Sequence, residues 1–421
     1  MGYTGARACL AGADWLNSQA LKSVFSLLGN HDEVRVVGGA VRDALFGAEV
    51  GDIDLATVHE PEEIMRRAEN AGIRAVATGG DHGTVSLIVV DADRTHVFEV
   101  TPLRIDVETD GRHALTAPTQ SWKLDAQRRD FTINALYCDE SGRVYDPVDG
   151  FGDVVAGRVR FIGLARQRIE EDYLRILRFF RFSAVYGKGA LDAQGLAACI
   201  DRKHGLAQLS AERVKKELFK LLVAPFASAV IERMVDIGVM GEVLPGQVLP
   251  QGVANLIGID PNADALLRLA VLAGGDTELL MTWAKRLKLS KKEIACLASL
   301  GRHIEAFTST LEEIAQKVLL YQLGENTYRQ CAVLAWSLEG ETADVCAWEK
   351  IVTLPQRWQV PVFSPTGADV LALGLEAGPQ VGNILSQLEQ EWIKAGFEWD
   401  ADEQMVRLKT IVQVRFKSTE E

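Results

Sequence analysis

The pattern of apolar residues changes once along the chain, near residue 150, and this change restricts the possible folds. Before it, short apolar runs typical of strands alternate irregularly with helical segments. From residue 164 onward nearly every segment is typical of a helix, with abundant Leu and Ala and few β-runs. The sequence therefore predicts an α+β fold class, in which an N-terminal α+β head is followed by several all-helical domains.

Size and composition indicate a globular chain of two to four domains. It has 421 residues, of which 48% are hydrophobic and 24% charged. No apolar run approaches the roughly 18 residues that a membrane-spanning helix needs, and the N-terminus does not resemble a signal peptide. The six cysteines are scattered without C-x-x-C spacing, as expected of reduced, mostly buried thiols. We therefore predict a cytoplasmic location without membrane attachment.

Within the head, the periodicity predicts specific elements. Helices are expected over residues 13–29, 40–47 and 61–71, and strands over residues 34–39, 52–57, 84–90 and 96–104. Residues 105–126 are polar and carry no clear period, so no element is predicted there. Residues 131–139 resume order, and residues 142–150 are expected to form a hairpin or turn.

Two features between residues 36 and 57 suggest chemistry. Gly38 and Gly39 permit close approach of the backbone to a ligand and lead into a predicted helix N-terminus, where free N–H groups favour anions. Arg42 adds a fork of donors suited to phosphate. Asp52 and Asp54, on one face of a predicted strand, could bridge hard divalent cations. By itself, however, a D-x-D pair is more often a solvated strand end.

Net charge limits the class of partner. The whole chain carries −13, which argues against indiscriminate binding to nucleic acid. Residues 154–220 nevertheless contain 14 Lys and Arg against 7 Asp and Glu. An acidic chain with such a basic segment can still bind one polyanion at that segment.

Three ordered motifs carry a resemblance to a known family. The segments "VGGAVRD…GDIDLAT", "RRDFTINALYCD" and "EEDYLRILRFFRF" follow one another between residues 37 and 182. They resemble the signature motifs of the class II tRNA nucleotidyltransferases, the CCA-adding enzymes, which share ancestry with bacterial poly(A) polymerases. The resemblance is strong over residues 34–220 and weaker to the C-terminus. It implies a polymerase-beta-like nucleotidyltransferase head with a mixed sheet, and transfer of CMP and AMP from CTP and ATP to a tRNA 3′ end with release of pyrophosphate.

The resemblance also implies roles for individual residues. Asp52 and Asp54 would hold two Mg²⁺ ions, with Mn²⁺ as the alternative, and Gly39 and Arg42 would contact the nucleotide phosphates. The residues expected to line the nucleotide site are Arg128, Arg129, Asp130 and Asn134. A structural ion pair is the competing interpretation for the two arginines. Glu99, on the next predicted strand, could be a third acidic group near the metals or a solvated surface residue.

Selection of cytosine and adenine can be explained by an acceptor beside a donor. Both bases present an amino donor next to a ring-nitrogen acceptor, whereas guanine and uracil invert this order. The Asp172 acceptor beside the Arg175 donor would pair with cytosine or adenine. With guanine or uracil, the same polar groups would stay unpaired. Family resemblance identifies these two residues as an amino-acid template, with Arg178 and Arg181 holding the base or the phosphates. We expect Asp172 and the three arginines, spaced by three, to lie side by side on one helix.

The remaining segments fit the same family. The expected domains are the catalytic head at 1–150, a nucleotide-selecting neck at 151–225, a helical body at 226–340 and a tRNA-binding tail at 341–421. Residues 104–126 lie where the family has a flexible loop associated with A addition. On the predicted neck helix, residues 210–222, three lysines either face phosphate or form a solvated face: Lys215, Lys216 and Lys220. Besides tRNA, CTP and ATP, no protein partner is implied.

Three alternatives remain open. A poly(A) polymerase has the same fold and uses ATP alone, and a CC-adding enzyme would stop before the final A. The retained loop length disfavours the second. A non-catalytic RNA-binding descendant is disfavoured because Asp52, Asp54, Arg42, Asp172 and Arg175 are all present.

Overall fold

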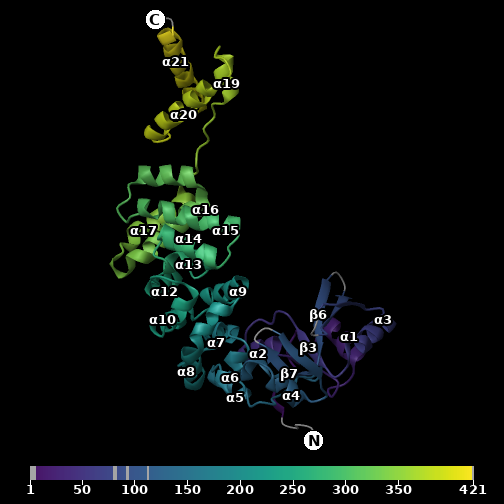
Figure 1. The fold of residues 1–421 in the computed structure, drawn as a ribbon. Helices are drawn as coiled ribbons and strands as arrows, with labels where there is room; N and C mark the ends of the chain where they lie inside the picture. Colours follow the sequence, from purple (N-terminus) through teal and green to yellow (C-terminus); the bar gives the residue numbers. More distant parts are fainter. Residues whose placement is uncertain (1–5, 79–82, 92–93, 111–112, 420–421) are drawn as a thin grey trace. The chain divides into compact units, whose positions relative to one another are not determined.

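The computed structural model describes residues 6–78, 83–91, 94–110 and 113–419 (Figure 1). Contacts divide the chain into two compact units. One comprises residues 1–254 and 282–290, and the other comprises residues 255–281 and 291–421. The division passes through α12 (Pro250–Ile259) and α14 (Thr277–Arg286), so the boundaries of the four predicted domains stay a prediction.

An eight-stranded mixed sheet forms the centre of the head, with strand order β1-β10-β9-β2-β3-β6-β5-β4. All neighbours pair antiparallel except β3 and β6, which are parallel. A separate hairpin consists of β7 and β8. The strands are β1 (Ala6–Cys9), β2 (Val34–Val37), β3 (Asp54–Thr57), β4 (Arg74–Ala77), β5 (Val85–Asp91), β6 (Arg94–Pro102), β7 (Arg104–Asp110), β8 (His113–Pro118), β9 (Tyr137–Cys138) and β10 (Arg143–Tyr145).

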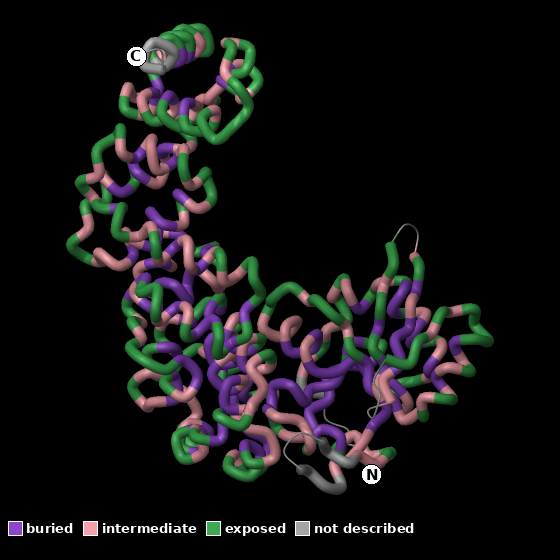
Figure 2. Tube along the Cα trace, turned by 45° about the horizontal axis from the view of Figure 1, so that its top comes forward, coloured by how far each residue is buried: buried purple, intermediate pink, exposed green. Residues whose placement is uncertain are grey.

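Apolar side chains hold helices against this sheet, and Figure 2 shows buried residues running through its centre. Helices α1 and α3 pack against each other and against β5, whereas α2 packs on β2. Leu21 and Val24 of α1 and Ile64 of α3 are fully buried, which explains the amphipathic pattern of both helices. The head helices are α1 (Gln19–Leu28), α2 (Gly39–Phe46), α3 (Pro61–Asn70), α4 (Trp122–Gln127) and α5 (Phe151–Ala156), with a short 3₁₀ helix, η2 (Thr132–Asn134).

An aromatic cluster joins the head to the helices that follow. Phe131 packs against Phe161 with ring centroids 4.8 Å apart, and against Phe182 of α7 at 5.5 Å. The cluster is buried, so these rings anchor α7 against the head. The helices of this region are α6 (Ala165–Glu171), α7 (Leu174–Tyr186), α8 (Ala193–Arg202), α9 (Ala211–Leu222), α10 (Ala227–Asp236) and α11 (Val239–Val243).

The second unit is helical throughout its described residues. Its long helix α16 contains a break at Gly324, whose φ of 72° is non-helical. A small core of apolar residues joins α19, α20 and α21, among them Val370, Ile384 and Leu408. The remaining helices are α12 (Pro250–Ile259), α13 (Ala265–Leu272), α14 (Thr277–Arg286), α15 (Lys291–His303), α16 (Glu313–Glu339), α17 (Val345–Val352), α18 (Leu354–Arg357), α19 (Gly367–Ala372), α20 (Pro379–Lys394) and α21 (Ala401–Thr419).

The predicted fold class is confirmed, but four local predictions are wrong. The first helix begins at Gln19 and not at residue 13, because the Ser18 side chain caps its N-terminus. Strand β3 begins at Asp54, so Asp52 precedes it. Strands β7 and β8 and helix α4 (Trp122–Gln127) overlap the stretch 105–126, where no element was predicted. Asp172 lies between α6 and α7, not on a helix with the three arginines.

Candidate active site

The turn from β2 into α2 places backbone close to neighbouring polar groups. Gly38 caps α2 with φ 73° and ψ −115°, a conformation that an L side chain rarely adopts. A Cβ added to Gly38 would lie 3.5 Å from the Asn134 carbonyl oxygen and 3.6 Å from Nη1 of Arg129. Glycine is therefore required here by its backbone conformation, and the Arg129 guanidinium lies beside the α2 N-terminus, where the helix end favours an anion.

Acidic side chains lie at the edge of the parallel strand pair. Asp54 of β3 pairs in register with Glu99 of β6, so the predicted neighbourhood of these two residues is present. Although solvent reaches Asp54, the surrounding protein removes part of its hydration and raises its pKa. The charges of Glu99 and Asp52 raise this pKa further, and the Arg129 guanidinium lowers it.

Crowded carboxylates of this kind fit a divalent cation. A bound cation would offset the mutual repulsion that raises the Asp54 pKa, and Mg²⁺ needs few protein carboxylates when substrate oxygens complete its shell. Across the described residues, no three His, Cys, Asp or Glu side chains form a metal-binding group by themselves. That Asp52 and Asp54 hold a metal together with a substrate stays a prediction.

The adjacent arginines of the second motif share one buried carboxylate. Asp125 of α4 is 1% exposed. Its Oδ1 accepts from Nη2 of Arg128 at 2.7 Å, and its Oδ2 accepts from Nη2 of Arg129 at 3.1 Å and from the Tyr137 hydroxyl at 2.7 Å. The structural ion pair considered for these arginines thus exists, and their role toward a nucleotide stays a prediction.

A continuous chain of polar contacts runs from the head into the helices. Arg42 donates to Oδ1 of Asn134 at 2.6 Å, and Nδ2 of Asn134 donates to Asp130 at 3.0 Å. Asp130 also accepts from Nε of Arg178 on α7 at 2.7 Å. Burial alone would raise the pKa of Asp130, but Arg178 and Asn134 lower it.

The chain continues to α9 through a carboxylate that the sequence analysis did not single out. Glu217 is 5% exposed, accepts from Nε of Arg181 at 2.5 Å and lies 3.8 Å from Nη1 of Arg178. Arg178 and Arg181 are therefore neighbours on one face of α7, as their spacing predicted. The predicted site residues joined in this way are Arg42, Asn134, Asp130, Arg178 and Arg181.

The predicted template residues are adjacent but have separate partners. Asp172 is extended, with φ −157° and ψ 105°, because its Oδ1 accepts the backbone N–H of Leu174 and starts α7. Its Oδ2 accepts from Arg213 of α9 at 2.7 Å. The Asp172 carboxylate therefore caps one helix while a second helix fixes its orientation.

Arg175 lies in the first turn of α7. Its Nη1 donates to the Arg168 carbonyl oxygen at 2.7 Å and to the Glu171 carboxylate at 2.5 Å. Among the partners of site residues that were missed are Asp125, Glu171, Arg213 and Glu217, and Asp43, which accepts from Nε and Nη2 of Arg42 at 2.9 and 3.1 Å. The charge pattern offered one signal, since Glu171 and Arg175 have the four-residue spacing of a helix ion pair.

Acid should weaken the head through Asp125. Burial alone would raise the pKa of this carboxyl, but Arg129, Arg128 and Tyr137 lower it to about 2. Because the folded pKa lies below the unfolded value of 3.8, folding favours the ionised form. This contribution, about 2 kcal/mol, is complete above about pH 5 and is lost as pH falls toward 2.

We therefore expect the stability difference between wild type and Asp125→Asn to shrink between pH 5 and pH 3. Thermal unfolding followed at several pH values measures it. A difference that stays constant over this range would contradict the assigned pKa.

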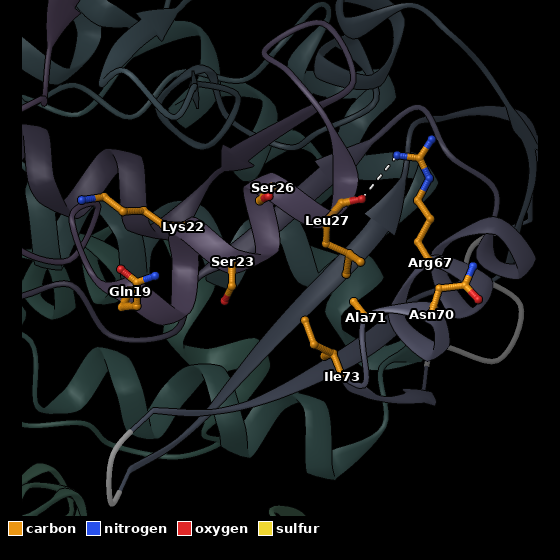
Figure 3. Close-up of a pocket in the computed structure, with 9 residues that line it drawn as sticks. All are labelled: Gln19, Lys22, Ser23, Ser26, Leu27, Arg67, Asn70, Ala71 and Ile73. Atoms are coloured by element: carbon orange, nitrogen blue, oxygen red, sulfur yellow. Dashed lines mark hydrogen bonds between the residues drawn. The ribbon is translucent and has the colours of Figure 1, made fainter.

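A separate hollow of about 830 Å³ lies between α1 and α3 (Figure 3). Its rim includes Lys22 and Arg67. Arg67 donates hydrogen bonds to the Glu63 carboxylate and to the carbonyl oxygens of Leu27 and Leu28. None of the predicted site residues lines this hollow, so it has no part in the candidate active site.

Comparisons with known proteins identify the family of the chain. Residues 34–160 match the family described as the poly A polymerase head domain, and residues 190–248 match a probable RNA- and SrmB-binding site of polymerase A. The chain is 35% identical over 413 residues to the mitochondrial CCA tRNA nucleotidyltransferase 1 of Mus musculus, covering 94% of this chain and 91% of that protein. The chain belongs to the CCA tRNA nucleotidyltransferase family.

Other members of the CCA tRNA nucleotidyltransferase family match at lower identity. The CCA-adding enzyme of Limosilactobacillus fermentum is 29% identical, covering 86% of this chain and 89% of that protein. The crystal structure of the Bacillus stearothermophilus CCA-adding enzyme in complex with CTP superposes with a TM-score of 0.72 at 25% identity, covering 95% of this chain and all of that chain. The resemblance carried by the three motifs is thereby confirmed.

The comparisons show the family of the chain but do not show its cellular location. No helix among the described residues is long and apolar enough to cross a membrane. The Mus musculus member of the CCA tRNA nucleotidyltransferase family is named as mitochondrial. The predicted cytoplasmic location therefore stays a prediction.

Proposed function

We propose that the chain adds the sequence CCA to the 3′ end of tRNA, using CTP and ATP and releasing pyrophosphate. The observation that carries the proposal is the convergence of Arg129, the α2 N-terminus at Gly38 and the carboxylate of Asp54. A triphosphate needs cationic donors on one side and metal-bound oxygens on the other. The relative from Bacillus stearothermophilus was solved with CTP, which supports the same ligand class here.

Each part of the site has a distinct role in this proposal. Gly39 and Arg42 contact the nucleotide phosphates, Asp52 and Asp54 bind two Mg²⁺ ions, and Asp130 and Asn134 hold Arg42 and Arg178 in place. When bound, the two ions stabilise charge on the attacking and leaving oxygens of the transfer. Among the expected contacts, Arg42 is 8% exposed, and its Nε and Nη2 donate to the Asp43 carboxylate at 2.9 and 3.1 Å, so its guanidinium is oriented before a nucleotide binds.

The template is the second part of the proposal. Arg213 fixes Asp172 and Glu171 fixes Arg175, so both groups are restrained before a base arrives. Such restraint lowers the entropy lost on binding. An acceptor beside a donor then matches the amino group and ring nitrogen of C or A.

The direct test is metal-dependent transfer. The purified chain should incorporate CMP from CTP into tRNA that lacks its 3′ end when Mg²⁺ is present, and chelation should abolish incorporation. Absence of incorporation by folded protein with both substrates and Mg²⁺ would contradict the proposed function.

We expect tRNA affinity to fall steeply with salt. Lys216 and Lys220 of α9 are exposed, and each lysine on a phosphate contributes about 0.9 to the slope of log affinity against log salt. Lys216→Ala/Lys220→Ala should therefore reduce this slope by about 2. Lys22→Ala, on α1 of the head, serves as the exposed control, and filter binding at several salt concentrations measures the slope. An unchanged slope in the double variant would mean that these lysines form a solvated face.

A further inference from the structure

Asp125 is bonded to both arginines of the second motif and to Tyr137. Its Oδ1 accepts from Nε and Nη2 of Arg128 at 2.9 and 2.7 Å. Its Oδ2 accepts from Nε and Nη2 of Arg129 at 3.3 and 3.1 Å, and from the Tyr137 hydroxyl at 2.7 Å. Each guanidinium thus presents two nitrogens to the same carboxyl group, an arrangement that fixes its plane.

The remaining donors of Arg129 face the candidate site. Its Nη1 lies beside Gly38, at 3.6 Å from where a Cβ would stand. The Arg129 charge also acts on Asp54. The edge of Arg129 that Asp125 does not hold therefore points to where phosphate and metal would meet.

Asp125 itself is too deep to touch a nucleotide. It is 1% exposed and lies among buried groups, since Tyr137 is fully buried and packs edge-on against Trp122 at 5.3 Å. Any effect of Asp125 on the reaction must therefore pass through the residues that it holds.

We propose that Asp125 is a positioning residue, which sets the direction of Arg128 and Arg129 and thereby the affinity for the incoming nucleotide. This inference rests on the proposed function. An amide at this position would place an NH₂ donor against guanidinium donors, so one arginine would lose its acceptor and turn away. Loss of one hydrogen bond to a charged group weakens binding by about 10- to 100-fold.

The test compares Asp125→Asn with Asp139→Asn in the full chain. Asp139 is also a buried carboxylate in the head, 3% exposed, and accepts from the Tyr145 hydroxyl at 2.8 Å, but it touches neither arginine. We expect Asp125→Asn to raise KM for CTP and ATP by about 10- to 100-fold, with a smaller change in kcat and unchanged tRNA affinity. Asp139→Asn should lower the unfolding temperature without changing KM.

A second comparison separates positioning from general support. In the background Arg128→Ala/Arg129→Ala, adding Asp125→Asn should leave KM unchanged, because the residues through which it acts are gone. A further rise in KM in that background, or equal KM in Asp125→Asn and wild type, would overturn the inference.

If Asp125→Asn does not fold, Tyr137→Phe provides the same comparison with a smaller change. Tyr137→Phe removes one donor from Oδ2 of Asp125 and should raise KM a few-fold, whereas Tyr145→Phe should leave KM unchanged. Equal KM values in these two variants would overturn the inference. An inactive wild type would contradict the proposed function instead, so the two failures are distinguishable.

Discussion

Asp54→Asn and Asp52→Asn should each reduce nucleotide transfer by about 1,000-fold while leaving tRNA affinity close to that of wild type. Losing a metal ligand removes several kcal/mol of transition-state stabilisation, and about 4 kcal/mol corresponds to about 1,000-fold. Both side chains are exposed at the edge of the head sheet, so their loss should leave the fold intact. Single-turnover incorporation of CMP measures transfer, and filter binding measures tRNA affinity.

Asp32→Asn, another exposed carboxylate of the head, is the matched control and should transfer normally. Near-normal turnover in either Asp52→Asn or Asp54→Asn would refute the metal assignment.

The Glu99→Gln substitution tests whether Glu99 is a metal ligand. If Glu99 only raises the Asp54 pKa, this substitution should move the acidic limb of the pH–rate profile to lower pH. If Glu99 is itself a metal ligand, the substitution should abolish transfer.

Arg175→Ala should lower the preference for CTP over UTP by about tenfold to a hundredfold. A good bidentate base contact contributes roughly 1–3 kcal/mol of discrimination. Arg175 lies on α7, apart from the strands that carry Asp54 and Glu99, so metal binding should not change. The measurement is the ratio of kcat/KM for CTP to that for UTP, with ATP and GTP compared in the same way.

Arg166→Ala on the neighbouring helix α6 is the control, since this arginine is 62% exposed and pairs with Glu170. An unchanged CTP/UTP ratio in Arg175→Ala, with both rates reduced equally, would mean that Arg175 supports structure or phosphate. The template would then lie elsewhere.

Much of the head could be predicted because β2 and β5 are rich in apolar residues and α1 and α3 are amphipathic. The pairing of β7 with β8 was missed because polar residues obscure the two-residue period. Asp52 was placed on a strand by its spacing. Strand β2, however, pairs with β3 only as far as Val37 opposite Asp54, and then turns into α2.

The site residues could be named from the sequence, but their partners could not. Asp125 holds residues only three and four positions away, yet its third contact, Tyr137, lies on a strand. Glu217 and Arg213 meet α7 and Asp172 from more than thirty residues along the chain. Contacts of this range depend on how α7 and α9 pack, which residue spacing within one segment does not determine.

The most direct test of the account is the product made on tRNA that lacks its 3′ end. CTP alone, ATP alone and both together should be offered with Mg²⁺, and the added nucleotides should be sequenced. We predict two C residues with CTP alone, no addition with ATP alone, and C-C-A with both. Runs of A from ATP alone would identify a poly(A) polymerase, and a product that ends at C-C with both nucleotides would identify a CC-adding enzyme; either result would contradict the proposed function.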